Sequence, residues 1–167
     1  CSWNEKSLIL SKFETMIQRI QSLYLLGGAL AILAMIFFPF SRVLTDGAIG
    51  YLYLHECRGD VLVAGVYNPL LLLFIGTITA VSFLIAIFLF KNRVRQMRFN
   101  AFVFVLNCML IGAMFFVPER LADAVHGNAY YKEIGIIMPL ISMVLLVFAN
   151  KAIRKDEMKV RAADRLR

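Results

Sequence analysis

The sequence predicts an all-α membrane protein, built as a bundle of four transmembrane helices with a small β-hairpin in the first extracytoplasmic loop. Hydrophobic residues make up 60% of the chain and its mean hydropathy is +0.74, whereas apolar residues form about 45–50% of a soluble domain. They are concentrated in four long blocks without charge, and almost all charged residues lie between or outside these blocks. Such segregation is typical of a bilayer, because a charge at its centre costs about 3 kcal/mol.

The four uncharged blocks predict one transmembrane domain over residues 16–150. The predicted helices cover about 20–40, 69–90, 99–117 and 134–149. At 1.5 Å per residue their lengths are roughly 24 to 33 Å, which matches a hydrocarbon core of about 30 Å. The first block is longer than the apolar part of a signal peptide, and no small-residue cleavage site follows it. Pro69 suits a first helical turn, and Pro118 is expected to end the third helix.

Lysine and arginine residues indicate which side of the membrane each connection faces. Fourteen of the 18 lie in residues 1–22, in the 91–98 connection and after Ala149, and the other two connections share four. Because cytoplasmic loops carry an excess of Lys and Arg, the N-terminus, the middle connection and the C-terminus are predicted to be cytoplasmic. Residues 151–167 are expected to form a basic tail that continues the fourth helix into the cytoplasm.

The outer loop 41–68 is expected to contain the small β-hairpin. Its strands are predicted at Gly50–His55 and Asp60–Val66, which are rich in β-forming residues, with the turn at residues 56–59. A lone hairpin is only marginally stable in water, so it is expected to pack on helix ends or on a partner. The second outer connection is expected to hold a short helical piece at Glu119–His126.

Two terminal stretches resemble the signatures of a known family. The first is M-I-Q-R-I-Q-S-L-Y-L-L at Met16–Leu26, and the second is A-N-K-A-I-R-K-D-E-M-K-V-R-A-A-D-R-L-R at Ala149–Arg167. They are similar to the opening and closing segments of an uncharacterised bacterial family of small four-helix inner-membrane proteins, a domain of unknown function. The resemblance covers about residues 16–167 and implies four spanning helices in the bacterial inner membrane. It implies no activity, ligand or catalytic residue.

Residues 1–15 precede the start of the family pattern, and three interpretations are open. The favoured one is that translation starts at Met16 and that the preceding residues come from an over-extended gene assignment. A second is an amphipathic helix that leads into the membrane, with one apolar face formed by Ile9, Phe13, Ile17 and Ile20. A third is a lipoprotein acylated at Cys1, which would put the N-terminus outside, against the charge distribution.

The residue types give no positive signal for catalysis or for a cofactor. His55, Glu56 and Cys57 are possible metal ligands, and His126 could approach them, but a structural metal site usually needs four compactly spaced ligands. They are expected to form an ordinary polar turn. Proton relays and ion-coupled transporters generally need an acid, a base or a histidine inside the bilayer, and none of the four blocks contains one. The sequence therefore predicts no catalytic, cofactor or metal site and no enzyme.

Six residues within the helices are candidates for helix packing or for a polar path. They are Gly76, Thr77, Thr79, Asn107, Pro139 and Ser142. Asn107 could either line a path or hydrogen-bond a neighbouring helix for about 0.6–2 kcal/mol, and we favour the hydrogen bond. Pro139 is expected to kink the fourth helix about one turn from its outer end, because its ring clashes with the Gly135 carbonyl. Gly76 begins a small-x-x-x-small pair that lets helices approach closely.

A basic patch is expected at the cytoplasmic face, where it would contact anionic lipids or an acidic protein surface. It comprises Lys91, Arg93, Arg95, Arg98, Lys151, Arg154, Lys155, Lys159, Arg161, Arg165 and Arg167. The patch lacks interleaved aromatic residues, so contact with ribosomal RNA is not favoured, and DNA binding is not expected. Two functions remain open: a non-catalytic accessory subunit that binds another inner-membrane protein or itself, and a small transporter or channel acting as a homo-oligomer. The first is favoured.

Overall fold

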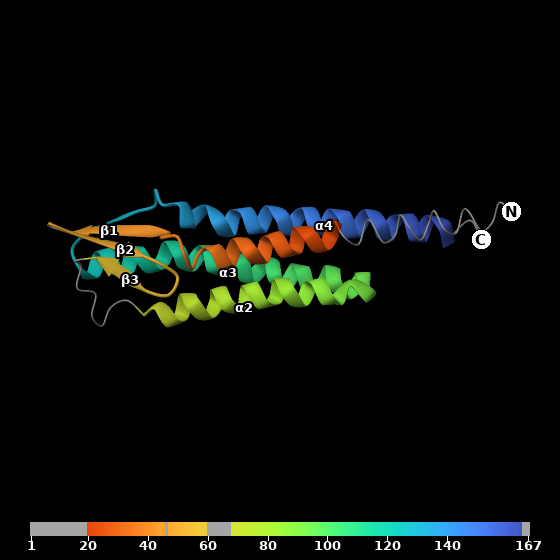
Figure 1. Ribbon diagram of the computed structural model, residues 1–167, viewed down its shortest axis with the longest axis horizontal. Helices are drawn as coiled ribbons and strands as arrows, with labels where there is room; N and C mark the ends of the chain where they lie inside the picture. Colours follow the sequence, from red (N-terminus) through yellow and green to blue (C-terminus); the bar gives the residue numbers. More distant parts are fainter. Residues whose placement is uncertain (1–19, 46, 60–67, 165–167) are drawn as a thin grey trace.

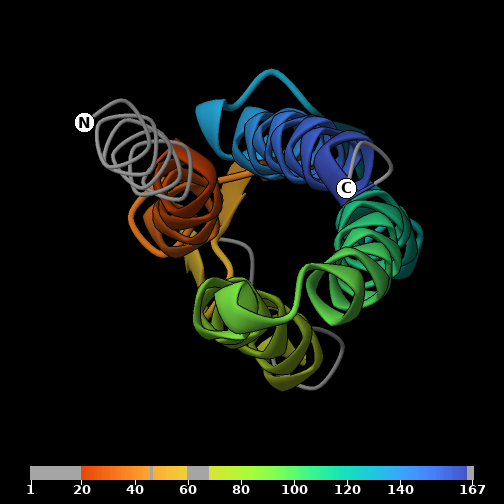
Figure 2. The same cartoon turned by 90° about the vertical axis from the view of Figure 1, so that its right-hand side faces the viewer.

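A computed structural model describes residues 20–45, 47–59 and 68–164 of the chain. Four helices lie along one long axis, and a small antiparallel sheet lies at one end of them, the sheet end (Figure 1). The helices are Ile20–Ala34, α2 (Pro69–Phe88), α3 (Arg93–Ala124) and α4 (Ile137–Asp164). Viewed along the axis they form a ring in the order of the sequence (Figure 2). The end where α2 connects to α3 is called the basic end.

The helices α2, α3 and α4 are long and apolar enough to cross a membrane, and the described part of the first helix is shorter. The first helix ends at Ala34 and not near residue 40, which corrects the predicted boundary. The Phe37 N–H donates to Ala34 O at 3.0 Å in a turn that closes the helix. The residue before Pro39 is disfavoured in helical conformation, and the Phe40 N–H already donates to Leu52 O in the sheet at 2.9 Å.

α2 begins at the predicted residue. Pro69 lies in its first turn, and Asn68 Oδ1 accepts a hydrogen bond from the Leu70 N–H at 3.0 Å. The short 3₁₀ helix η1 (Leu89–Lys91) follows, and Asn92 Oδ1 then accepts from the Arg95 N–H at 3.2 Å to cap α3. Two capped helices with a short connection form an antiparallel pair, as α2 and α3 do in Figure 1.

α3 and α4 both extend beyond the predicted apolar blocks. α3 begins at Arg93 and passes through Pro118 to Ala124, so the prediction that Pro118 ends this helix is wrong. A proline removes a single N–H from the helix, and the burial of Pro118 in the packed interior outweighs that loss. The helical piece predicted at 119–126 is therefore the last part of α3. α4 runs to Asp164, which confirms that the tail continues the fourth helix.

Glycines allow close contact between the first helix and its two neighbours. A Cβ added at Gly28 would overlap the buried ring of Phe83 on α2. One added at Gly27 would lie 3.2 Å from Leu145 Cδ1 on α4. The first helix therefore packs between α2 and α4, in agreement with its position in Figure 2.

The sheet has four strands where a two-stranded hairpin was expected. They are β1 (Ser41–Thr45), β2 (Ala48–Leu52), β3 (Cys57–Gly59) and β4 (Asn128–Tyr130), in the order β3-β2-β1-β4. The predicted strand Gly50–His55 overlaps β2, and the predicted turn at 56–59 contains β3. The second predicted strand, Asp60–Val66, lies outside the described residues. The hairpin turn thus falls earlier, where the Tyr53 N–H donates to Glu56 O at 2.8 Å.

The sheet packs on the last part of α3, which reaches beyond the start of α4 at this end (Figure 1). Val43 of β1 and Leu52 of β2 are fully buried on the face that contacts the helices. Thr45 Oγ1 donates to Val125 O at the end of α3, at 2.8 Å. A further contact joins the turn before β3 to α2, because Leu54 packs against Gly76. A Cβ added at Gly76 would lie 2.9 Å from Leu54 Cδ2.

α3 ends in a helix-terminating turn that leads directly into β4. His126 has a left-handed backbone conformation, with φ of 52°. The Gly127 N–H donates to Ala122 O at 2.8 Å, and the His126 N–H donates to Asp123 O at 3.3 Å, which together form a Schellman motif. A Cβ at Gly127 would overlap the Leu44 carbonyl of β1. This glycine therefore permits the close approach that brings β4 alongside β1.

Candidate functional site

One face of the sheet carries a row of alternating arginine and tyrosine residues, which we call the Arg–Tyr ladder. Arg58 pairs with Tyr51, Tyr51 with Arg42, and Arg42 with Tyr130, so the row crosses all four strands. Directly paired residues in antiparallel strands project from the same face of the sheet. The opposite face, which includes Val43, is buried against the helices. The Arg–Tyr ladder therefore projects away from the bundle.

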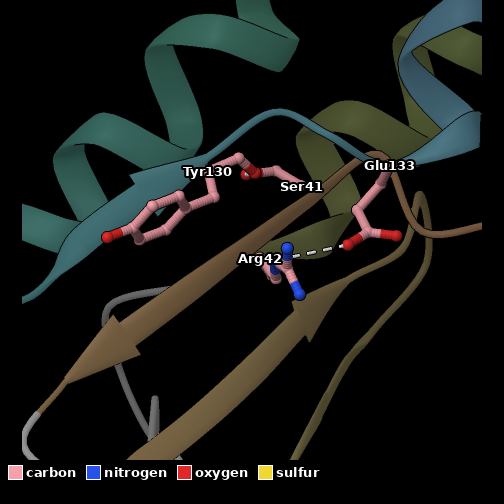
Figure 3. Close-up of polar contacts among 4 residues, drawn as sticks. All are labelled: Ser41, Arg42, Tyr130 and Glu133. Carbon is pink, nitrogen blue, oxygen red and sulfur yellow. Dashed lines mark hydrogen bonds and ion pairs between the residues drawn. The ribbon is translucent and has the colours of Figure 1, made fainter.

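Carboxylates hold the two arginines of the ladder. Arg42 Nε lies 3.5 Å from Glu133 Oε1, and Figure 3 shows the Arg42 side chain reaching from β1 toward Glu133. Arg58 forms an ion pair with Glu56, and its guanidinium carbon lies 5.0 Å from the centre of the Tyr53 ring. The Arg58 side chain is nevertheless 63% exposed. The ladder is thus pre-ordered and still accessible from outside the molecule.

The composition of this face is typical of protein interfaces. Tyrosine and arginine are enriched at interface hot spots, because each combines a large contact area with hydrogen bonding. Tyr130 is 40% exposed, and the adjacent row adds Ile49, which is 42% exposed and pairs with Leu44. The face therefore offers cationic, aromatic and aliphatic groups next to one another.

This surface was not predicted from the sequence, because its strands come from two separate loops. Ser41 Oγ donates to Tyr130 O at 3.1 Å across a sequence separation of 89 residues, and Figure 3 shows the two residues side by side. The dipeptide Asp46-Gly47 lies between two β-rich runs and is a strong sequence signal for a two-residue hairpin connection. That signal could have located β1 and β2. β4 has no comparable signal, since it is three residues long and depends on pairing with β1.

The segment from His55 to Cys57 lies at the turn into β3. His55 Nε2 is 3.2 Å from Glu56 Oε1. In the part of the chain that the structure describes, no three His, Cys, Asp or Glu side chains are grouped so that they could hold a metal ion. Cys57 packs partly against the hydrophobic core, and this burial raises the pKa of its thiol above the ordinary value.

A line of polar contacts joins α3 to α4. The contacts are Asn107 Nδ2 to Ser142 Oγ at 2.8 Å and to Pro139 O at 3.0 Å, Asn100 Nδ2 to Asn150 Oδ1 at 2.8 Å, and Arg93 Nη2 to Asp156 Oδ2 at 3.4 Å. The three α3 residues are spaced by seven positions, about two helical turns, so they lie on one stripe that faces α4. We call this line the polar seam.

Replacing Asn107 with leucine is expected to lower the stability of the bundle by no more than about 1 kcal/mol. The loss is small because Ser142 Oγ also donates to Pro139 O at 2.8 Å, and because Asn107 Oδ1 is buried without a partner in the described structure. The measurement is the thermal unfolding midpoint in detergent, with Ser142→Ala as the comparison. A loss of about 3 kcal/mol or more would contradict this account of the seam.

The other helix candidates do not join the polar seam. Thr77 Oγ1 donates to Leu73 O at 2.6 Å and lies in an open hollow on the outside of α2. Thr79 is buried, and its hydroxyl donates to Ile75 O at 2.7 Å. The hydroxyl groups of both threonines therefore donate within α2 itself, whereas Asn107 and Ser142 form a hydrogen bond between α3 and α4.

Pro139 lies in the first turn of α4 and not in its interior, which corrects the expected kink. α4 begins at Ile137, so a proline at its third residue removes an N–H that has no partner within the helix. Gly135 belongs to the preceding 3₁₀ helix η2 (Ile134–Ile136), so its carbonyl is not in the α4 turn that Pro139 was expected to distort.

The described residues of the predicted basic patch lie at the basic end and along the charged C-terminal part of α4, and they differ in their surroundings. Arg93 is paired with Asp156, whereas Arg95 and Arg98 are exposed. Lys151 and Arg154 border a groove between α3 and α4. Lys155 is exposed on α4. The side chains of Lys91, Lys159 and Arg161 and the whole of Arg165 and Arg167 lie outside the described structure.

Comparison with known proteins gives one assignment. No curated protein and no solved structure matches the chain. The family model described as domain of unknown function (DUF4293) matches residues 17–166, nearly the whole chain and almost the range over which the terminal signatures indicate a resemblance. The chain therefore belongs to this family of unknown function.

Proposed function

We propose that the chain is a multi-pass protein of the bacterial inner membrane with four spanning helices. The polarity of α3 supports this proposal, because it is the reverse of that of a soluble helix. Asn100 and Asn107 are fully buried, whereas Phe102, Val105 and Phe116 are more than half exposed. Water disfavours such an apolar outer surface, whereas lipid accommodates it and leaves buried amides to bond between helices.

The proposed orientation has the basic end in the cytoplasm, with both termini, and the sheet end outside. The distribution of lysine and arginine supports it, because most of those within the described ranges lie at the basic end or beyond it along α4. Glu119, Arg120 and Asp123 of α3 are exposed at the sheet end, so they would reach water on the outer side.

Labelling of Cys57 tests this orientation. In a chain with Cys1→Ser and Cys108→Ala, a membrane-impermeant maleimide added to intact cells is expected to label Cys57. The rate is expected to rise from about pH 7 to about pH 9, because burial raises the pKa of the thiol and only the thiolate reacts. Arg58→Cys combined with Cys57→Ser is the control and should label faster, since residue 58 is exposed. Labelling only after permeabilisation would reverse the orientation.

Within the membrane, we infer that the protein is a non-catalytic interaction subunit that docks a partner on the Arg–Tyr ladder. The ladder carries this inference, because it is a pre-ordered, hot-spot-like row on the sheet face away from the helices, with Arg58 63% and Tyr130 40% exposed. The partner would be another inner-membrane protein with an outer segment, or a second copy of this chain.

Matched arginine variants test the docking surface. Arg58 and Arg120 both lie at the sheet end and both lie over an aromatic ring, Arg58 over Tyr53 and Arg120 over Phe116, but Arg120 is not on the sheet. The protein is extracted in mild detergent and purified by an N-terminal tag. Wild type is expected to retain a partner in stoichiometric amount, and Arg58→Ala and Tyr130→Ala to retain only a small fraction of that amount. Arg120→Ala should retain it. A wild-type protein that runs as a lone monomer, or equal retention by all variants, would overturn the proposal.

A transport function is less well supported by the same observations. Its candidate residues do not line one path, since Thr77 lies on the outer surface of α2 and Asn107 bonds Ser142 between helices. Large apolar side chains are buried in the interior of the bundle, among them Leu72, Phe83 and Leu110. A homo-oligomer without any other protein, left intact by Arg58→Ala and Tyr130→Ala, would return attention to this function.

A further inference from the structure

An open groove runs between α3 and α4 on the outer surface of the bundle near the basic end. It consists of two adjacent hollows of about 560 Å³ and 480 Å³, which share Asn150 and Arg154 as lining residues. One stripe of α4 forms a side of the groove, because Val147, Asn150, Lys151 and Arg154 follow the spacing that places residues on one helix face.

The chemistry of the groove changes along its length. Toward the middle of the bundle its walls are Ala101, Phe104 and Val105 of α3 and Val147 of α4. Toward the basic end the same stripe of α4 becomes polar and cationic. This change occurs where the apolar part of α4 gives way to its charged extension, which is the level of lipid headgroups if the helix spans a membrane.

The polar seam orients one donor into the groove. Asn100 is fully buried, and its Nδ2 donates to Asn150 Oδ1 at 2.8 Å. An amide whose oxygen is occupied in this way presents its NH₂ group elsewhere, and Asn150 is on the wall of both hollows. Asn150 and Arg154 therefore line both hollows, and Lys151 borders the second, with its ammonium 6.0 Å from the centre of the neighbouring Phe148 ring.

We propose that this groove binds one anionic glycerophospholipid from the surrounding leaflet. Its phosphodiester lies against Asn150, Lys151 and Arg154, and an acyl chain lies along the apolar wall. This site rests on the proposed membrane location and does not depend on the docking of a protein partner. The match of donors to phosphate at one end, and of apolar side chains to a hydrocarbon chain at the other, favours a lipid over a free phosphate.

The charges in the groove favour a headgroup with a single negative charge. Lys151 and Arg154 are cationic, and Glu157 also lines the hollow nearest the basic end. The two cations exceed the carboxylate by one charge, which one phosphodiester neutralises. Phosphatidylglycerol carries that charge, whereas the ammonium group of phosphatidylethanolamine cancels it.

Native mass spectrometry of the full chain from nanodiscs tests this site. The nanodiscs contain phosphatidylglycerol and phosphatidylethanolamine in equal amounts, and the adducts that survive release are counted. Wild type is expected to retain one phosphatidylglycerol, and Lys151→Gln with Arg154→Gln to retain about tenfold less. The matched control, Arg95→Gln with Arg98→Gln, removes the same charge from the basic end outside the groove and should bind as wild type.

A second variant separates the lipid from free phosphate. Ala101→Trp fills the apolar wall and leaves every charge in place, so it is expected to reduce retention of the lipid as well. Equal losses in both charge variants would show general surface attraction and would overturn the site, as would preferential retention of phosphatidylethanolamine. If the protein stays in the membrane during alkaline carbonate treatment but retains neither lipid preferentially, the lipid site alone is refuted. Extraction by carbonate would refute the membrane location itself.

Discussion

Replacing Gly28 with alanine is expected to destabilise the bundle by about 1–3 kcal/mol, although alanine is the better helix former. The new methyl group would overlap the ring of Phe83, which is fully buried on α2. A ring in a packed core cannot rotate away freely, so the first helix must move outward and loses contact with its neighbours. In a chain of this size we expect the unfolding midpoint in detergent to fall by about 2–12 °C.

Two further variants show whether crowding is the cause. Gly112 of α3 has nothing within 4 Å of the position that a Cβ would occupy, so Gly112→Ala is expected to leave the midpoint unchanged or to raise it. Phe83→Leu added to Gly28→Ala makes room for the methyl group and should recover part of the loss. Equal effects at Gly28 and Gly112, or no recovery in the double variant, would refute this account of the helix contact.

Gly135→Ala is expected to have the larger effect, a loss of about 3 kcal/mol or more. A Cβ at this position would lie 2.5 Å from Pro39 O and 2.8 Å from Phe38 O. The Gly135 N–H also donates to Pro39 O at 2.9 Å, which joins the start of α4 to the chain between the first helix and β1. Relief of the overlap would break this hydrogen bond and separate the two segments.

The identity of the crowded atoms distinguishes this prediction from a simple change of volume. At Gly76 an added Cβ would meet side-chain carbons of Leu54, the nearest at 2.9 Å, and a small shift of that side chain relieves the overlap without moving any backbone. Gly76→Ala should therefore lower the unfolding midpoint by clearly less than Gly135→Ala, although both glycines are buried. If the two variants lose the same stability, backbone contact at Gly135 does not decide the effect.

The three long apolar helices were predictable from the sequence, because the bilayer demands about 20 apolar residues in succession. The uncharged block at 99–117 lies within α3, and Pro69 begins α2 as its missing N–H requires. The ends of α3 were not predictable in the same way. Hydropathy changes at Arg98 and Pro118, but the backbone hydrogen bonds of a helix continue wherever packing supports them.

The favoured role of Asn107 shows how far residue chemistry alone can go. A lone amide in an apolar block must find a partner inside the protein, and this requirement needs no knowledge of the fold. Its partners, Ser142 and the Pro139 carbonyl, could be known only once α3 and α4 were placed side by side. The pairing of Asn100 with Asn150 was not predicted.

Sequence patterns were enough to predict that this protein is mostly helical, that at least three of its helices are apolar enough to cross a membrane, and that its charges lie at the helix ends. These properties are local, since each follows from a continuous run of residues. Only the tertiary structure decided the four-stranded sheet, the Arg–Tyr ladder and the groove between α3 and α4. The reason is physical: Ser41 and Tyr130 lie 89 positions apart, and only packing of the sheet on α3 brings such residues together.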